Sequence, residues 1–235
     1  MKREARVNCA RCGKYACLGA GYLSGPDDCP TRVSSDVIEE MRERYRDPAL
    51  AEFARQASIV EAQAYTRVPW SEAPTPLTTR LEEIISLARR MGYKRLGVAF
   101  CAGLSDEART LVFILERCAF EVVSVCCKVG GIAKEEIGVK DVEKIRPGRY
   151  ESMCNPVSQA AILDREECQF NIMIGLCVGH DSLFLKHIKG LTTVFAVKDR
   201  LLGHNPIAAL YLSRSYYRRL NSPNLADRII GEEPT

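Results

Sequence analysis

The sequence lacks long apolar runs and carries little excess charge. No uninterrupted apolar stretch approaches the ~18 residues that a membrane span requires. The opening residues 1–8, MKREARVN, contain no apolar core of a secretory signal peptide. The formal net charge is only +3, and the basic residues decorate expected helices rather than forming a stripe with aromatic partners. We therefore expect a cytoplasmic protein that binds neither membrane nor nucleic acid.

Cysteine, by contrast, is abundant, with 11 residues in a chain of 235. Because the cytosol keeps thiols reduced, this number favours metal binding or catalysis over disulfides. The odd total also argues against a closed disulfide framework. The hydrophobic content of 46% and the charged content of 27% are ordinary for a globular protein, so we expect a sizeable core.

The sequence pattern divides the chain into three parts. Residues 1–33 are rich in cysteine and glycine without periodicity, which predicts a metal-binding knuckle. Residues 34–76 predict two helices, over 34–45 and 47–65, and then a linker marked by prolines. Residues 77–235 predict an α/β domain, because helical patterns alternate there with short apolar runs.

The last part predicts a mostly parallel sheet with helices on both faces, a Rossmann-like three-layer α/β architecture preceded by the knuckle and its helices. Strands are expected over residues 95–101, 120–127, 171–177 and 192–197. Helices are expected over residues 79–91, 105–118, 155–167, 181–188 and 206–220. The residues expected to cap these helices are Thr79 with Glu82, then Ser105, Asn155, Asp181 and Asn205. The tail from Asn221 is expected to be mobile.

Thiols gather at one edge of this predicted sheet. Cys101, Cys127 and Cys177 each end a strand, and Cys154 stands directly before a helix start. Since the carboxyl ends of parallel strands share one edge, we expect these thiols to meet there, close to helix N-termini that stabilise thiolates. Cys126 and Cys127 alternate faces of a strand, so only one of them should reach the site directly.

Soft thiolates suit zinc or iron–sulfur clusters, and a free cysteine is also an ordinary small core residue. We favour the core interpretation for Cys118 and Cys168. We expect Cys127, Cys154 and Cys177 to hold a [4Fe–4S]-type cluster. Cys101 or Cys126 would then be the fourth ligand or a reactive thiol.

Polar residues expected at the same edge favour a cluster with an open coordination position. His180 and His204 would transfer protons or orient a substrate, and Lys198 would hold a small anionic molecule. Asp181 completes this predicted catalytic set. The ordinary alternatives are that both histidines make loop hydrogen bonds, that Asp181 is an N-cap, and that Lys198 is a surface charge.

The N-terminal part holds a second cysteine pattern, Cys9-x2-Cys12-x4-Cys17-x11-Cys29, followed at once by Pro30. Four cysteines in so short a run predict a metal site. The Cys-Pro ending is similar to that of bacterial ferredoxin runs, although the inner spacings differ, and the x2 pair is also a zinc-knuckle feature. We expect an iron–sulfur cluster here, with zinc as the alternative.

These motifs as a set resemble the domain-of-unknown-function 1847 family of predicted metal-binding, cysteine-rich proteins of anaerobic bacteria and archaea. The resemblance covers nearly the whole chain. It rests on the N-terminal run and on CAGL at 101–104, CCKVGG at 126–131, CNP at 154–156, GLCVGHDSLF at 175–184, KDR at 198–200 and GHNP at 203–206. It implies metal binding and no particular reaction. An open three-cysteine site is also similar in chemistry to that of iron–sulfur desulfidases.

The sequence therefore predicts an iron–sulfur protein with two [4Fe–4S] sites. In one interpretation it is an enzyme, an oxidoreductase or a desulfidase-like protein, and an electron-transfer partner serves the knuckle cluster. The alternatives are a non-catalytic metal or electron carrier, and a zinc-knuckle protein with a thiol-lined pocket. Tyr211, Tyr216 and Tyr217 on the last predicted helix would form either a homodimer face or an ordinary core stripe.

Overall fold

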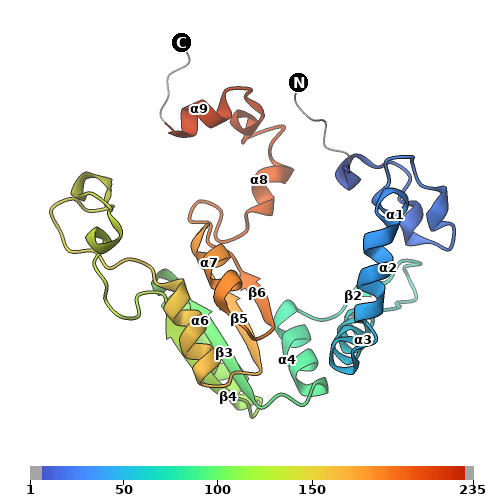
Figure 1. Cartoon of the computed structure of the whole chain (residues 1–235), viewed down its shortest axis with the longest axis horizontal. Helices are drawn as coiled ribbons and strands as arrows, with labels where there is room; N and C mark the ends of the chain where they lie inside the picture. Colours follow the sequence, from blue (N-terminus) through green and yellow to red (C-terminus); the bar gives the residue numbers. More distant parts are fainter. Residues whose placement is uncertain (1–6, 231–235) are drawn as a thin grey trace. The chain divides into compact units, whose positions relative to one another are not determined.

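The computed structural model describes residues 7–230, and the chain divides between Gln63 and Ala64 into two compact units. Figure 1 labels the helices and strands of both units. The predicted helical segment and linker over 34–76 span this division. No helix within the described residues is long and apolar enough to cross a bilayer.

The first unit consists of short turns followed by helices. Its elements are the 3-10 turns η1 (Cys9–Arg11), η2 (Ala16–Leu18) and η3 (Tyr22–Ser24) and the helices α1 (Pro30–Val33), α2 (Ser35–Arg44) and α3 (Pro48–Gln63). Asp47 caps α3, since its carboxylate accepts the Leu50 N–H at 2.9 Å. Among residues 7–33 only Gly25 is buried. An apolar core therefore does not hold the knuckle together.

The second unit contains the sheet. Its elements begin with β1 (Tyr65–Thr66), β2 (Thr75–Pro76), α4 (Arg80–Arg90), β3 (Arg95–Phe100), η4 (Ala102–Leu104), α5 (Ser105–Arg117) and β4 (Glu121–Cys126). They continue with η5 (Lys134–Ile137), η6 (Asp141–Glu143), α6 (Pro156–Arg165), β5 (Phe170–Ile174), α7 (His180–His187), β6 (Thr192–Ala196), α8 (Ile207–Tyr211), η7 (Arg218–Asn221) and α9 (Leu225–Ile230).

The sheet has the strand order β4-β3-β5-β6, and all its pairings are parallel. From β3 the chain crosses to β4 on one side, and it later returns to place β5 on the other side of β3. Such a reversal opens a crevice outside the carboxyl ends of the two central strands, where ligands bind in open α/β sheets. The predicted α/β class, with helices against a parallel sheet, is confirmed.

Helices cover both faces of the sheet. On one face Ala99, Val125 and Met173 pack with side chains of α6 and α7, among them Leu163 and Phe184. Residues that alternate with these along the strands, such as Val98, point to the opposite face, where α5 packs against β3 and β4. Cys168 is buried in the first of these layers, as expected for a core cysteine, and Cys118 is half-buried at the end of α5.

Two of the five helix N-caps predicted in the second unit are confirmed. Thr79 and Glu82 form a capping box, and the Asn155 side chain accepts the Ser158 N–H at 3.1 Å. The other three predicted caps are wrong: α5 follows Leu104, α7 follows Gly179, and α8 follows Pro206, so neither Ser105, Asp181 nor Asn205 is the N-cap.

The predicted last helix, over 206–220, is also wrong. Helix α8 ends at Tyr211, and the chain continues through turns to η7 and then to α9. The Asn221 side chain donates to the Ser213 carbonyl at 2.7 Å, and the Ser215 hydroxyl donates to the Leu212 carbonyl, so polar side chains take up carbonyls that a continuing helix would use. Of the tail expected to be mobile, Leu225–Ile230 is helical and residues 231–235 lie outside the described part.

Candidate metal and thiol sites

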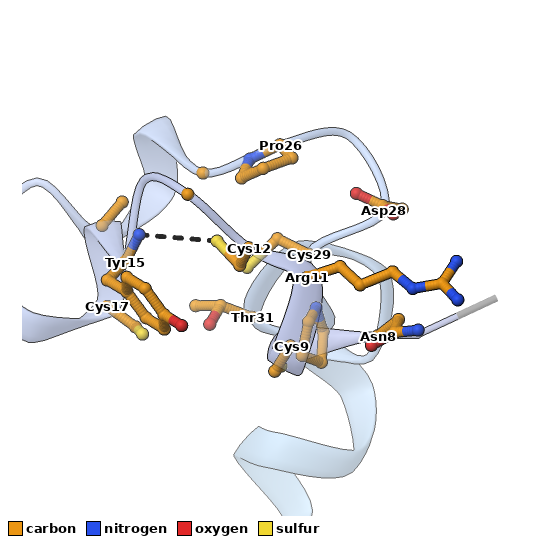
Figure 2. Close-up of a pocket in the computed structure, with 14 residues that line it drawn as sticks. Asn8, Cys9, Arg11, Cys12, Tyr15, Cys17, Pro26, Asp28, Cys29 and Thr31 are labelled. Carbon is orange, nitrogen blue, oxygen red and sulfur yellow. Dashed lines mark hydrogen bonds between the residues drawn. The ribbon is translucent and has the colours of Figure 1, made fainter. Parts of the chain in front are cut away.

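The cysteines of the N-terminal run share one pocket. Figure 2 shows the pocket, which has a volume of about 660 Å³ and is lined by residues that include Cys9, Cys12, Cys17 and Cys29. The η1 turn brings the first two together, because the Cys12 N–H donates to the Cys9 carbonyl at 3.0 Å. The predicted spacing therefore does place all four thiols around one space.

A backbone hydrogen bond also holds one sulfur of the knuckle. The Tyr15 N–H donates to the Cys12 sulfur at 3.4 Å, the dashed contact of Figure 2. A hydrogen bond of this kind stabilises negative charge on sulfur. Cys9 and Cys17 are exposed, and Cys12 and Cys29 are half-buried, so the set is open to a metal from solvent. Four thiols around one cavity are a donor set that fits soft metals and iron–sulfur clusters.

At the carboxyl edge of the sheet, three thiols from separate segments come together. Cys101 follows β3, Cys127 follows β4, and Cys154 directly precedes the N-cap of α6. The Cys127 thiol is hydrogen-bonded to both of the others. We call this set the sheet-edge triad; it contains three of the four thiols expected to meet at this edge.

Backbone hydrogen bonds hold the triad in place. The Cys127 N–H donates to the Phe100 carbonyl at 2.8 Å, which continues the β3–β4 ladder up to the cysteines. The Asn155 N–H donates to the Cys127 carbonyl at 2.7 Å and so draws Cys154 alongside. The Ala102 N–H, at 3.4 Å, then donates to the Cys127 sulfur itself.

Charge and hydrogen bonding favour the thiolate form at the two outer members of the triad. The hydrogen bond from Cys127 lowers the pKa of Cys101 to about 5 against the opposing effect of burial, and the Gly103 N–H and the Lys198 ammonium lower it further. Gly103 leaves room for that ammonium, since a Cβ there would stand 3.2 Å from Lys198 Nζ.

Cys154 has the corresponding surroundings on the other side of Cys127. The Cys127 hydrogen bond lowers the pKa of Cys154 to about 5, and the charges of Lys128 and His180 act in the same direction. The pKa of Cys127 itself is raised, because its thiol interacts with both neighbouring cysteines and is buried. The triad is therefore a central thiol between two thiolates, with a lysine beside each thiolate.

Two cysteines expected at this edge lie outside the triad. The Cys177 sulfur accepts a hydrogen bond from Arg200 Nη2 at 3.1 Å. The Cys126 thiol makes no hydrogen bond within the described residues. Cys126 is the last residue of β4, and because neighbouring residues of a strand point to opposite faces, it points away from Cys127. The predicted ligand set is Cys127, Cys154 and Cys177. The structure instead brings Cys101 together with Cys127 and Cys154.

The predicted catalytic residues divide in a similar way. His180 lies close enough to Cys154 for its charge to act there, and its Nδ1 atom is buried without a hydrogen-bond partner in the part of the chain that the structure describes. Lys198 contacts Cys101. His204 Nδ1 accepts the Asp199 N–H at 3.1 Å, so it braces the loop after β6. Asp181 Oδ1 accepts the Ser182 N–H at 2.7 Å within the first turn of α7.

One residue that supports the triad was not predicted from the sequence. The Gln159 amide, fully buried on α6, donates to the Phe100 carbonyl at 3.2 Å and to the Val125 carbonyl at 2.7 Å. These carbonyls precede the triad cysteines on β3 and β4, so Gln159 ties the two strand ends to α6. The sequence did offer one indication of this role, because Gln159 is a polar residue on an otherwise apolar face of the predicted helix.

Neither cysteine set is already arranged for a single metal ion. Among residues 7–230, no three His, Cys, Asp or Glu side chains converge on one point as ligands of an ion. The pocket at the knuckle is much larger than the ~30 Å³ that one water takes in the liquid, so it has room for a group of several atoms. Both sets consist of thiols, the ligands of iron–sulfur clusters, and rotation of the cysteine side chains would turn these thiols toward a bound cluster.

Comparison with known proteins gives the following findings. The family described as "Protein of unknown function (DUF1847)" matches residues 29–195. An uncharacterized protein of Methanocaldococcus jannaschii is 40% identical over 214 residues, which cover 91% of this chain and 98% of that protein. No solved structure matches the chain. The family match includes the sheet-edge triad and begins at Cys29, after the first three cysteines of the knuckle.

Proposed function

The chain belongs to the DUF1847 family of proteins of unknown function, as its motifs predict, and on that premise we propose that it is an iron–sulfur protein. The observation that carries the proposal is the shared pocket of Cys9, Cys12, Cys17 and Cys29. Thiolates are the ligands that hold iron–sulfur clusters, and four of them complete a cluster. The pocket has room for a [4Fe–4S]-type cluster.

The second part of the proposal concerns the sheet edge. Cys101, Cys127 and Cys154 would hold a second [4Fe–4S]-type cluster through three thiolates. The fourth position would then be open to a substrate at the carboxyl edge of the sheet, the edge at which open α/β sheets bind ligands. An iron–sulfur cluster held in this way supplies an iron that can bind a substrate group or pass on an electron.

Residues around the triad suit a small anionic molecule. Lys128 and Lys198 place positive charge beside the two outer thiolates. The unpartnered Nδ1 of His180 is free to hold or deliver a proton close to Cys154. The proposed reaction class is therefore redox or sulfur chemistry on such an anion, and the knuckle would receive electrons from a partner protein.

Elemental analysis after anaerobic purification tests the proposal. We expect about eight irons and as many acid-labile sulfides per chain, about four at each site, with a brown visible spectrum. Cys12→Ser should remove about half of the iron, and Cys154→Ala should remove the other half, because the two cysteine sets lie in different units. The double variant should be colourless.

Cys118→Ser is the matched control, since this thiol lies half-buried at the end of α5, before strand β4 begins, whereas the triad lies at the carboxyl edge of the sheet. It should keep all of the iron. A colourless wild-type protein that contains zinc and no labile sulfide would contradict the proposal and support the zinc-knuckle alternative. Unchanged iron in Cys154→Ala would remove the triad from the proposal while leaving the knuckle cluster in it.

A further inference from the structure

The sheet-edge triad has a second property that does not depend on metal, namely that its thiols are in direct contact with one another. Cys101 and Cys127 belong to one cluster of buried residues, against which Cys154 packs, and the Cys127 side chain interacts with both of the others. Backbone bonds tie the same three positions, one from Cys127 to β3 and one from Asn155 to Cys127. Thiols held this close can form a disulfide with little backbone movement.

Burial distinguishes the roles of the three thiols. The Cys127 side chain is 1% exposed and Cys101 is 9% exposed, whereas Cys154 is half-buried and so is the member that a molecule from solvent reaches first. An accessible thiol beside a shielded one is the arrangement that thiol–disulfide exchange requires. The outer thiol reacts with the incoming disulfide, and the inner one completes the exchange.

Positive charge lies at the accessible thiol. The Lys128 ammonium is close enough to hydrogen-bond to Cys154, and it is held there by the Ser152 carbonyl at 2.6 Å. His180 adds its side chain on the same cysteine. A cation beside a partly exposed cysteine is the environment of a nucleophilic thiol. The same cation attracts small disulfides that carry carboxylates.

We propose that in the metal-free protein Cys154 and Cys127 form a dithiol site that exchanges with small anionic disulfides. The Cys154 thiolate attacks one sulfur of the disulfide RSSR, whose S–S bond breaks. A Cys154–SR mixed disulfide forms, and RS⁻ leaves with the charge. Cys127 then attacks the Cys154 sulfur, the second RS group leaves with the Cys127 proton, and the Cys127–Cys154 disulfide remains. The protein loses two electrons, and the small disulfide gains them as RS⁻ and RSH.

The inference rests on the proposed function in one respect, since the triad thiols are also the proposed cluster ligands. Disulfide formation would then prevent the metal-free site from binding a cluster, because a disulfide cannot ligate iron as two thiolates do. The two proposals are separable by experiment. Iron and sulfide content tests the cluster, and disulfide mapping of metal-free protein tests the exchange, whichever metal the purified protein holds.

The test uses full-length protein stripped of metal by chelator and reductant, then incubated anaerobically with oxidised glutathione, alkylated with iodoacetamide and digested with trypsin. Cys154 falls in peptide 150–165, Cys101 in 96–109, and Cys127 in 118–128 together with Cys118 and Cys126. We expect mass spectrometry to find peptide 150–165 linked to 118–128, with fragment ions that place the bond on Cys127.

Variants assign the steps. Cys127→Ala should stop at a glutathione adduct on Cys154, and Cys154→Ser should lose both the adduct and the link. Cys126→Ser, the chain neighbour of Cys127, should behave as wild type. Should Cys127→Ala fail to fold, the wild-type time course still decides, because the Cys154 adduct must appear before the link. A wild type in which Cys154 remains alkylated, or in which the new disulfide joins Cys101 to Cys127, would overturn the proposal.

Discussion

At the scale of single residues, the position of Cys127 explains the behaviour of its neighbours. Its thiol interacts with both Cys101 and Cys154, and this contact and burial raise its pKa, so it keeps its proton. The two outer cysteines therefore hold negative charge in the folded chain, where Lys198 and Lys128 balance it. In the unfolded chain these partners are lost and the thiols return to their ordinary pKa.

This difference predicts how the stability of the metal-free protein depends on pH. The pKa of Cys101 and that of Cys154 are each about 5 when folded against 9.0 ordinarily, so their contribution to stability is complete above pH 9. It should decrease as the pH falls through this window and vanish below pH 5. We expect the urea concentration at the midpoint of unfolding to decrease as the pH is lowered from 9 to 5. Cys154→Ser should flatten that slope, and a midpoint that rises on acidification would contradict the assignment.

Single residues also show where prediction from sequence reached its limit. The parallel sheet was enough to predict that thiols meet at one edge, but it could not select Cys101 over Cys177. The chain turns sharply at Gly175, whose φ of +69° would strain any other residue, and a Cβ there would stand 2.6 Å from Leu104. The strand alternation ends at this turn, so Cys177 meets Arg200.

At the scale of elements, helix α6 is what carries Cys154 to the sheet edge. Asn155 caps it through the Ser158 N–H, and its backbone N–H joins the Cys127 carbonyl. Asn155→Ala should lower the free energy of unfolding by about 1 kcal/mol, as for other caps of this type, measured by urea unfolding.

The matched control for this prediction is Asn205→Ala. Asn205 also stands before a proline at a helix start, but α8 has no side-chain cap hydrogen bond. Its replacement should change the free energy of unfolding by less than about 0.5 kcal/mol. Equal losses for the two variants would show that the Asn155 cap does not stabilise α6.

The two Asn-Pro sequences also illustrate what local pattern can and cannot predict. Both suggest a helix start, and helices do begin at Pro156 and at Ile207. Helix α6 continues because its face packs into the core through Ala160 and Leu163. Helix α8 ends after five residues, because Leu210 and Tyr211 remain exposed and their side chains do not provide the packing that would stabilise further turns.

At the scale of the whole molecule, the order of strands and helices could be predicted because apolar runs and capping residues alternate regularly after Thr78. The knuckle could be recognised from cysteine spacing, although only the structure gives the pocket that its thiols share. Its conformation could not be derived from packing, because its residues bury almost no side chains. A homodimer through the exposed Tyr211 and Tyr216 stays a prediction.

X-ray absorption at the iron and zinc edges of anaerobically purified protein shows whether the chain binds iron through sulfur. We predict an iron spectrum with a shell of sulfur neighbours and a second shell of iron; in Cys12→Ser and in Cys154→Ala both shells should remain while the iron edge step falls to about half. Zinc alone, or iron surrounded by oxygen and nitrogen, would contradict the proposal.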